Sequence, residues 1–200
     1  MSTFKSAALA SVSLLSMALC PQAQAAVWKI DTAHSSADFA VRHLMISNVK
    51  GRFPKVEGSV DYDGKDLKGL KVEADIDVSS VDTGEKARDE HLKSPDFFDA
   101  AKFPKMTFKS KKVKSQGKGK FALTGDLTMK GVTKEVTLQV EGPSAEIKDM
   151  KGSQRVGASA STTINRKDFG ITWNKAMDNG GSVVGEEVKI SLEIEAVKQQ

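Results

Sequence analysis

Cysteine is almost absent from this chain. Its one cysteine, Cys20, lies in an N-terminal segment that we expect to be removed on export. Without another thiol, the rest of the chain cannot form a disulfide, a thiolate nucleophile or a cysteine-based metal cluster. The fold must therefore be stabilised by a packed core.

Long apolar runs are scarce as well. The main one, residues 7–19, is too short to span a bilayer as a helix. Lys5 precedes it and Ala23 and Ala25 follow it, which is the pattern of a cleavable secretory signal. The alternative, an uncleaved membrane anchor, is disfavoured by the short apolar core. We predict a signal over residues 1–25, one domain of about 175 residues over 26–200, and a periplasmic location.

Common motifs for catalysis and cofactor binding are missing too. The sequence contains no G-x-S-x-G nucleophile elbow. The histidines His34, His43 and His91 have no H-x-x-x-H spacing of the kind that favours zinc. Gly117 and Gly119 lie in a lysine-rich turn, without the strand–helix setting of a phosphate loop. We therefore predict no catalytic residue, no metal, no cofactor and, in the absence of RNA- or DNA-binding motifs, no nucleic-acid partner.

What the chain does have is a repeated alternation of apolar and polar residues. Between Leu70 and Val78 every second residue is apolar and the residues between them are charged or polar. This period of two indicates a strand with one buried face. The same pattern predicts eight strands, at residues 27–43, 50–62, 70–78, 105–113, 120–129, 132–140, 156–164 and 188–196.

Eight strands with short turns and no long amphipathic helix indicate a single all-β antiparallel domain. Closure into a barrel is favoured because it removes both edges of the sheet. A two-sheet sandwich is the competing architecture. An eight-stranded barrel is wide enough to hold one small or elongated apolar ligand.

The strand pattern is interrupted between Arg88 and Phe108. Asp82 or Thr83 could cap a short helix over residues 85–92, and Ser94 could start a further turn before Pro95. Four phenylalanines follow, at positions 97, 98, 103 and 108. Two interpretations are equally supported: a loop whose aromatic rings plug the core, or the mouth of a ligand-binding barrel.

His43 also allows two interpretations. It shares a predicted face with Phe39 and Val41, which the pattern turns inward. It is either a core histidine with one hydrogen bond or a polar contact within a pocket.

Lysines are concentrated in one region. They are residues 102, 105, 109, 111, 112, 114, 118 and 120, in a chain whose net charge is +4. The simpler interpretation is a solvated hairpin kept soluble by its charges. The alternative is a surface for anionic head groups or a membrane.

Several short motifs, in order along the chain, resemble the YceI-like family of exported, lipocalin-like polyisoprenoid-binding proteins. They include Phe39-x-Val41-x-His43, Gly51-Arg52-Phe53, Arg88-Asp89-x-His91-Leu92, Phe103-Pro104-x-Met106-Thr107-Phe108, the run from Gly125 to Thr133, and Asn165-Arg166-x-Asp168-Phe169-Gly170. Each motif is weak by itself, but their order and spacing cover nearly the whole predicted domain.

The resemblance implies an extended eight-stranded antiparallel barrel with short helical insertions, whose bore holds one long isoprenoid or fatty chain, and no established catalysis. The tunnel lining it implies is Phe39, Val41, Phe53, Phe97, Phe98, Phe103, Met106, Phe108, Leu127, Met129, Phe169 and Trp173. His43 is added as the candidate polar contact. Arg88, Asp89 and His91 would pin the insertion to the barrel, although contact with ligand is also open.

We therefore expect a periplasmic carrier of a polyisoprenoid or similar lipid, such as a quinone tail or a lipid precursor, and not an enzyme. One alternative is an enzyme acting on lipid or quinone, with His91 and Asp89 as an acid–base pair. Another is an interaction protein that docks a membrane through its lysine-rich hairpin. A dimer is compatible with all three.

Overall fold

The structure is a computed structural model that describes residues 26–178 and 180–199. The signal predicted for residues 1–25 lies outside these residues. The strands are β1 (Ala26–Ile30), β2 (Ser36–His43), β3 (Ser47–Phe53), β4 (Val56–Tyr62), β5 (Lys71–Asp77), β6 (Lys105–Gly117), β7 (Lys120–Met129), β8 (Val132–Glu141), β9 (Ile147–Lys148), β10 (Gln154–Asn165) and β11 (Val184–Lys198). The helical elements are α1 (Lys86–Lys93) and the short 3-10 turns η1 (Thr32–His34), η2 (Val78–Ser80) and η3 (Arg166–Phe169). None of the helices in the described residues is long and apolar enough to cross a bilayer.

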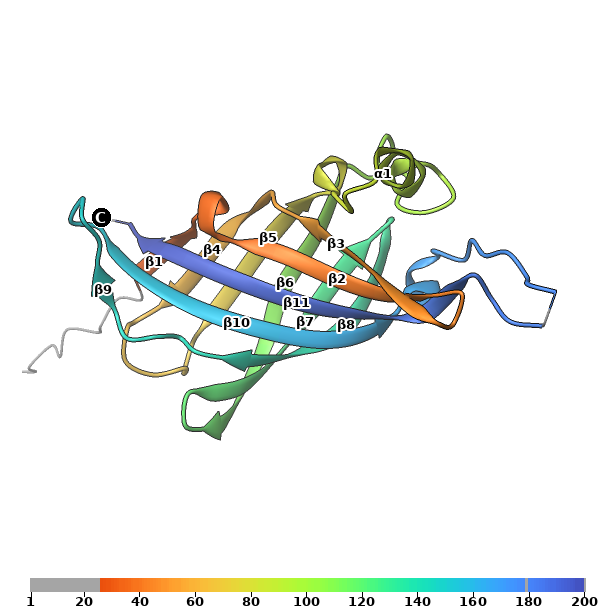
Figure 1. The fold of residues 1–200 in the computed structure, drawn as a ribbon. Helices are drawn as coiled ribbons and strands as arrows, with labels where there is room; N and C mark the ends of the chain where they lie inside the picture. The colour runs from red at the N-terminus through yellow and green to blue at the C-terminus, as the bar shows by residue number, and fades with distance from the viewer. Residues whose placement is uncertain (1–25, 179, 200) are drawn as a thin grey trace, which may run out of the picture.

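The strands form one antiparallel sheet that closes on itself (Figure 1). Closure comes from β11, which pairs with β10 along eleven residue positions and with β1 and β2 on its other edge. The closed ring runs β11-β1-β4-β5-β6-β7-β8-β10 and back to β11, which is the predicted eight-stranded barrel. The competing sandwich is therefore excluded.

Two predicted strands are each broken in two. The stretch predicted as one strand over 27–43 is interrupted by η1, because the Asp31 carboxylate accepts the backbone N–H of Ala33 at 3.0 Å and starts a 3-10 turn. The prediction of a single strand was wrong there. Residues 50–62, predicted as one strand, likewise divide into β3 and β4 around Pro54.

These breaks open the barrel wall at one end. β4 pairs with β5, but β3 leaves the ring and pairs with β2. The gap beside β3 is covered by residues 78–104, which we call the insert and which contain η2 and α1 (Figure 1). A two-residue bridge between Arg52 and Asp82 ties β3 to the start of the insert.

The helix of the insert begins one residue later than predicted. Its N-cap is Glu85, whose carboxylate accepts the N–H of Ala87 at 3.3 Å, so the proposed caps Asp82 and Thr83 were wrong. The reason is that both side chains are engaged elsewhere, Asp82 with the N–H of Gly84 and Thr83 with Asp89. Ser94 ends α1 by donating to the carbonyl of His91, and a turn follows it as expected.

The two ends of the barrel differ. The insert end carries the insert, the β7–β8 turn, η3 and the β2–β3 hairpin. The far end carries the β6–β7 turn and Trp28, which is fully buried and donates from its indole N–H to the carbonyl of Tyr62 at 3.0 Å. Separate apolar clusters pack at each end, one around Phe97 and Phe169 and the other around Phe121 and Leu138.

Candidate functional site

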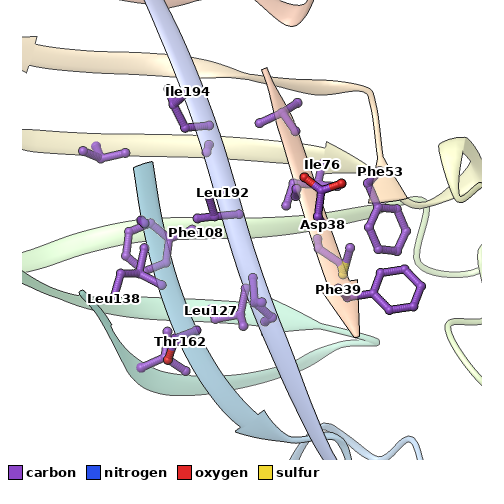
Figure 2. Close-up of a pocket in the computed structure, with 18 of the residues that line it drawn as sticks. Asp38, Phe39, Phe53, Ile76, Phe108, Leu127, Leu138, Thr162, Leu192 and Ile194 are labelled. Carbon is purple, nitrogen blue, oxygen red and sulfur yellow. The ribbon is translucent and has the colours of Figure 1, made fainter. Parts of the chain in front are cut away.

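A long cavity of about 250 Å³ runs between these two clusters. Its wall is made of the inward residues of the barrel strands, because alternation along each strand sends every second side chain to the interior. It extends from Phe97 and Phe98 at the insert end to Tyr62, Phe121 and Val140 at the far end. Figure 2 shows part of this wall, with Phe39 and Phe53 to one side and Phe108, Leu127 and Leu138 further along.

The cavity is hollow and not filled by side chains meeting across the middle. Val188, Ile190, Leu192 and Ile194 of β11 all face inward, yet each is only half-buried. Apolar side chains inside a packed core lose nearly all of their exposure. The exposure that remains on β11 is exposure to the empty bore.

Polar side-chain atoms are rare along this wall. Thr162 faces the cavity from β10 (Figure 2). Tyr62 lines the far end, where burial, followed by the nearby carboxylates of Asp63, Glu146 and Asp66, raises the pKa of its phenol. Asp38 also borders the cavity, but its register places it opposite Arg52 and Ser191 on the outer face of the sheet. The bore therefore suits a ligand with few polar groups.

Arg166 closes one corner of the cavity with a buried positive charge. Its side chain donates to four backbone carbonyls: Ile171 at 2.7 Å, Gly185 at 2.8 Å, Trp173 at 2.9 Å and Val184 at 3.3 Å. Burial lowers the pKa of its guanidinium from the usual range. These bonds join η3, residues 171–173 and the start of β11, so Arg166 is a structural tie at the insert end.

The aromatic rings of the insert reach into the barrel. Phe98 lies edge-on to Phe53, with ring centroids 5.5 Å apart, and Phe53 in turn lies 5.7 Å from Phe39. The ring of Phe39 occupies the space above Gly51, where any Cβ would come within 2.4 Å of it. The insert therefore plugs the opening beside β3 while also lining the cavity, so the two interpretations of its aromatic cluster are compatible.

Polar contacts hold the insert in this position. The Asp89 carboxylate accepts both the N–H and the hydroxyl of Thr83, and Arg88 donates to the hydroxyl and carbonyl of the same residue. Lys130, in the β7–β8 turn, donates to the carbonyl of Pro95 at 2.8 Å. The expected pinning role of Arg88 and Asp89 is thus visible, although they act largely within the insert.

The cavity wall includes nine of the thirteen residues proposed as ligand contacts. These are Phe39, Val41, Phe53, Phe97, Phe98, Met106, Phe108, Leu127 and Met129. The other four, His43, Phe103, Phe169 and Trp173, do not line it. Whether the nine contact a ligand stays a prediction.

Each of those four residues has another place. His43 is half-buried at the end of β2, opposite Ser47 and Val184. Phe103 lies over Gly131, Phe169 is buried in η3, and Trp173 packs against Phe97. They support the insert end from outside the bore.

The structure does not bring His91 and Asp89 together as an acid–base pair. His91 contacts Asp96 through Nε2 at 3.0 Å and lies edge-on to Phe97 and Trp173. Asp89 is occupied by Thr83, and neither His91 nor Asp89 lines the cavity. The arrangement therefore gives no support to the alternative of a lipid- or quinone-modifying enzyme using this pair.

One group of side chains on the outer surface has the composition of a cation site. Ligand atoms of Asp31, His34 and Glu195 lie within 4.8 Å of one another. Arg155 already occupies the group, donating to Asp31 at 2.6 Å, to Glu195 at 2.5 Å and to Asp149 at 2.7 Å. The Arg155 guanidinium, followed by His34, lowers the pKa of Asp31 to about 2. The group is therefore an ion-pair network that joins the start of η1, just after β1, to β10 and β11.

The lysine-rich hairpin is less positive than its sequence suggests. On the outer face of the sheet, Lys105 pairs with Asp75, Lys109 with Glu73, Lys111 with Asp126, and Lys120 with Glu141. Such exposed pairs contribute little stability, but they neutralise half of the run. This favours the solvated-hairpin interpretation over a membrane surface.

The prediction missed the part of the wall formed by β10 and β11. The omitted residues are Val156, Ala158, Ala160, Thr162 and Ile164 on β10, and Val188, Ile190, Leu192, Ile194 and Ala196 on β11. Both runs had been identified as alternating strands, so the inward set could have been read from the same period of two. Tyr62, Leu70 and Phe121 at the far end were also omitted, although the same alternation turns them inward.

Comparisons with known proteins agree with this architecture. Residues 28–196 match the YceI-like domain. A UPF0312 protein of Staphylococcus aureus is 42% identical over 165 residues, which cover 82% of this chain and 94% of the relative. The YceI protein of Campylobacter jejuni has a TM-score of 0.67 at 33% identity, covering 79% of this chain and 90% of that one.

Two further solved structures share the fold. Burkholderia cenocepacia BcnA has a TM-score of 0.68 at 25% identity, over 83% of this chain and 98% of that one. A polyisoprenoid binding domain from Saccharophagus degradans, implicated in plant cell wall breakdown, has a TM-score of 0.65 over 88% of this chain and all of that one. At 16% identity, its likeness concerns the fold alone.

Proposed function

This chain belongs to the YceI-like family, and from that premise we propose that its barrel binds one long apolar lipid, of the polyisoprenoid class, in the central cavity. The observation that carries the proposal is the hollow bore, walled almost entirely by apolar side chains. The ligand class is supported by the resemblance of the chain's motifs to the polyisoprenoid-binding YceI-like family, and the fold shared with a polyisoprenoid binding domain is compatible with it.

The size of the cavity sets a scale for this binding. An engineered apolar cavity of ~150 Å³ holds benzene, so in proportion a cavity of about 250 Å³ accommodates roughly ten carbons, which is about half of a C20 prenyl chain such as geranylgeraniol, and the rest of such a chain would extend out of the bore. At about 0.8 kcal/mol for each buried CH₂, ten carbons contribute roughly 8 kcal/mol before the costs of association. Selection for chain length would be loose, because one methylene is a small part of this total.

We further propose that the protein works as a carrier or scavenger in the periplasm and not as an enzyme. The secretory pattern of residues 1–25 supports export. Among the residues that the structure describes, the bore offers hydroxyls at Thr162 and Tyr62 but no adjacent acid–base pair, which supports binding over turnover.

Lipid extraction tests this function directly. Protein purified from exporting cells is extracted with organic solvent, and the extract is analysed by mass spectrometry. Delipidated protein is then offered geranylgeraniol, and uptake is measured by the same method. We expect prenyl lipid in the extract and about one geranylgeraniol bound per barrel. Protein that arrives empty and also takes up no geranylgeraniol contradicts the proposal.

A further inference from the structure

The β2–β3 hairpin ends in an unusual turn. Leu44 and Met45 both have positive φ, of 48° and 62°, and the N–H of Ile46 donates to the carbonyl of His43 at 3.1 Å. Positive φ at both central positions is the pattern of a type I′ turn, which strongly favours Asn-Gly. Leucine and methionine at these positions strain the backbone, and such strain is found at sites where the side chains have a function.

The side chains at this turn face water. Leu44 is 37% exposed, Met45 54% and Ile46 76%. Three consecutive apolar residues at the end of a hairpin form a protruding apolar tip, which we define as residues 44–46. Contiguous exposed apolar surface of this kind marks a contact with a partner or a membrane.

The hairpin itself carries charge of one sign. No acidic residue occurs between Asp38 and Glu57. Within that stretch Arg52 pairs with Asp82 and Lys55 with Asp77, whereas Arg42 and Lys50 have no ion-pair partner among residues 26–178 and 180–199. Arg42 and Lys50 lie on the outer face of the hairpin, directly behind the tip.

The tip also lies at the insert end of the barrel. Its first residue, Leu44, donates from its N–H to the carbonyl of Val183 at 2.8 Å, and Figure 1 shows the hairpin projecting beside the loop that precedes β11. The other exposed large apolar residues of the described chain are Val27, Ile147 and Met150, in or beside β1 and β9 away from the insert. An apolar tip backed by unpaired cations suits the interface of a bilayer that contains anionic lipids, where the tip enters the acyl boundary and the cations meet the head groups.

We propose that residues 44–46 are a membrane-docking tip, which places the insert end of the barrel against an anionic bilayer. The partner is the lipid surface itself and not a second protein. This inference goes beyond the proposed function and does not require it, because the tip lies outside the cavity wall.

Vesicle flotation tests the docking tip with protein that begins at Ala26, where the barrel begins. The vesicles contain phosphatidylethanolamine with phosphatidylglycerol, or phosphatidylcholine alone. The main variant is Leu44→Asn with Met45→Gly, which removes apolar surface and relieves the strained turn. We expect its partition onto the anionic vesicles to fall about tenfold or more, while its unfolding temperature stays equal or rises.

Two further variants isolate the cause. Replacing Arg42 and Lys50 by glutamine should weaken binding to anionic vesicles about fivefold to tenfold, remove most of its salt dependence and leave binding to phosphatidylcholine unchanged. Met150→Ser removes a methionine that is even more exposed than Met45, elsewhere on the barrel, and should leave flotation unchanged. Geranylgeraniol uptake from detergent should be unaffected in all three variants, which separates docking from ligand binding.

Several results would overturn the proposal. Parent protein that does not float with anionic vesicles, or a turn variant that floats as well as the parent, removes the membrane as the partner. So does a Met150→Ser variant that loses as much binding as the turn variant. If sedimentation shows that the turn variant only converts a dimer to a monomer, with flotation unchanged, the tip is a protein contact.

Discussion

Filling the bore is the most direct perturbation of the proposed lipid site. Ala160 of β10 lines the cavity, opposite Val140 on β8 and Leu192 on β11. Ala160→Phe adds a six-carbon ring to this wall. Ala122→Phe makes the same change on β7, where the alternation with the buried Phe121 and Leu123 places residue 122 on the outer face.

The expected effect follows from the volume of the cavity. A ring the size of benzene occupies much of an engineered apolar cavity of ~150 Å³. A volume of that size is more than half of the cavity of about 250 Å³ in this barrel. If the bore then loses room for about six carbons of the ligand, binding weakens by about 5 kcal/mol, or more than a thousandfold. The free energy of unfolding of the empty protein should stay unchanged or rise by about 1 kcal/mol, because the ring buries apolar surface without overfilling the space.

Uptake and stability are measured side by side. Delipidated parent, Ala160→Phe and Ala122→Phe are titrated with geranylgeraniol, and each is unfolded in urea. We expect only Ala160→Phe to lose uptake, with all three equally stable or the filled variant more stable. If Ala160→Phe binds geranylgeraniol as tightly as the parent and remains folded, the lipid chain does not occupy this part of the bore and the reasoning from cavity volume is refuted.

Three other perturbations test the site and its frame. Replacing both Phe98 and Phe108 with serine should reduce uptake at least tenfold with little change in far-UV circular dichroism, whereas an equal loss of both signals would mean that these rings only plug the core. Arg166→Leu removes the hydrogen bonds to four backbone carbonyls and should lower the free energy of unfolding, measured by urea titration, by about 3 kcal/mol. An unchanged urea midpoint of unfolding would contradict the role of Arg166 as a structural tie. The pKa of Asp31, about 2 when folded, lies below its usual value of 3.8 because of Arg155. Ionised Asp31 therefore stabilises the fold above about pH 4, and up to about 2 kcal/mol of this is lost as the pH falls toward 2. Arg155→Met should flatten that part of the stability–pH curve.

The strands themselves could be predicted from the sequence, since their signal is local. The alternation over 120–129 identified β7 with the bounds found in the structure. It could do so because, in a strand with one buried face, the polarity of each side chain indicates whether that side chain faces the core or the solvent. The aromatic cluster at Phe97 and Phe98 was recognised in the same way, as an apolar excess where the strand pattern stops.

The breaks in the strands and the closure of the barrel were decided by tertiary structure. Nothing in the alternation of residues 27–43 marks the point where β11 changes its partner from β1 to β2, because that exchange depends on a strand about 150 residues away. Arg155 and Asp31 meet across a separation of 124 residues. The hollow is also tertiary: inward residues such as Leu192 carry the same pattern whether the opposite wall touches them or leaves a bore between. Strand polarity sets which side chains point inward, and the distance between walls, set by how all eight strands close, sets whether a lipid has room there.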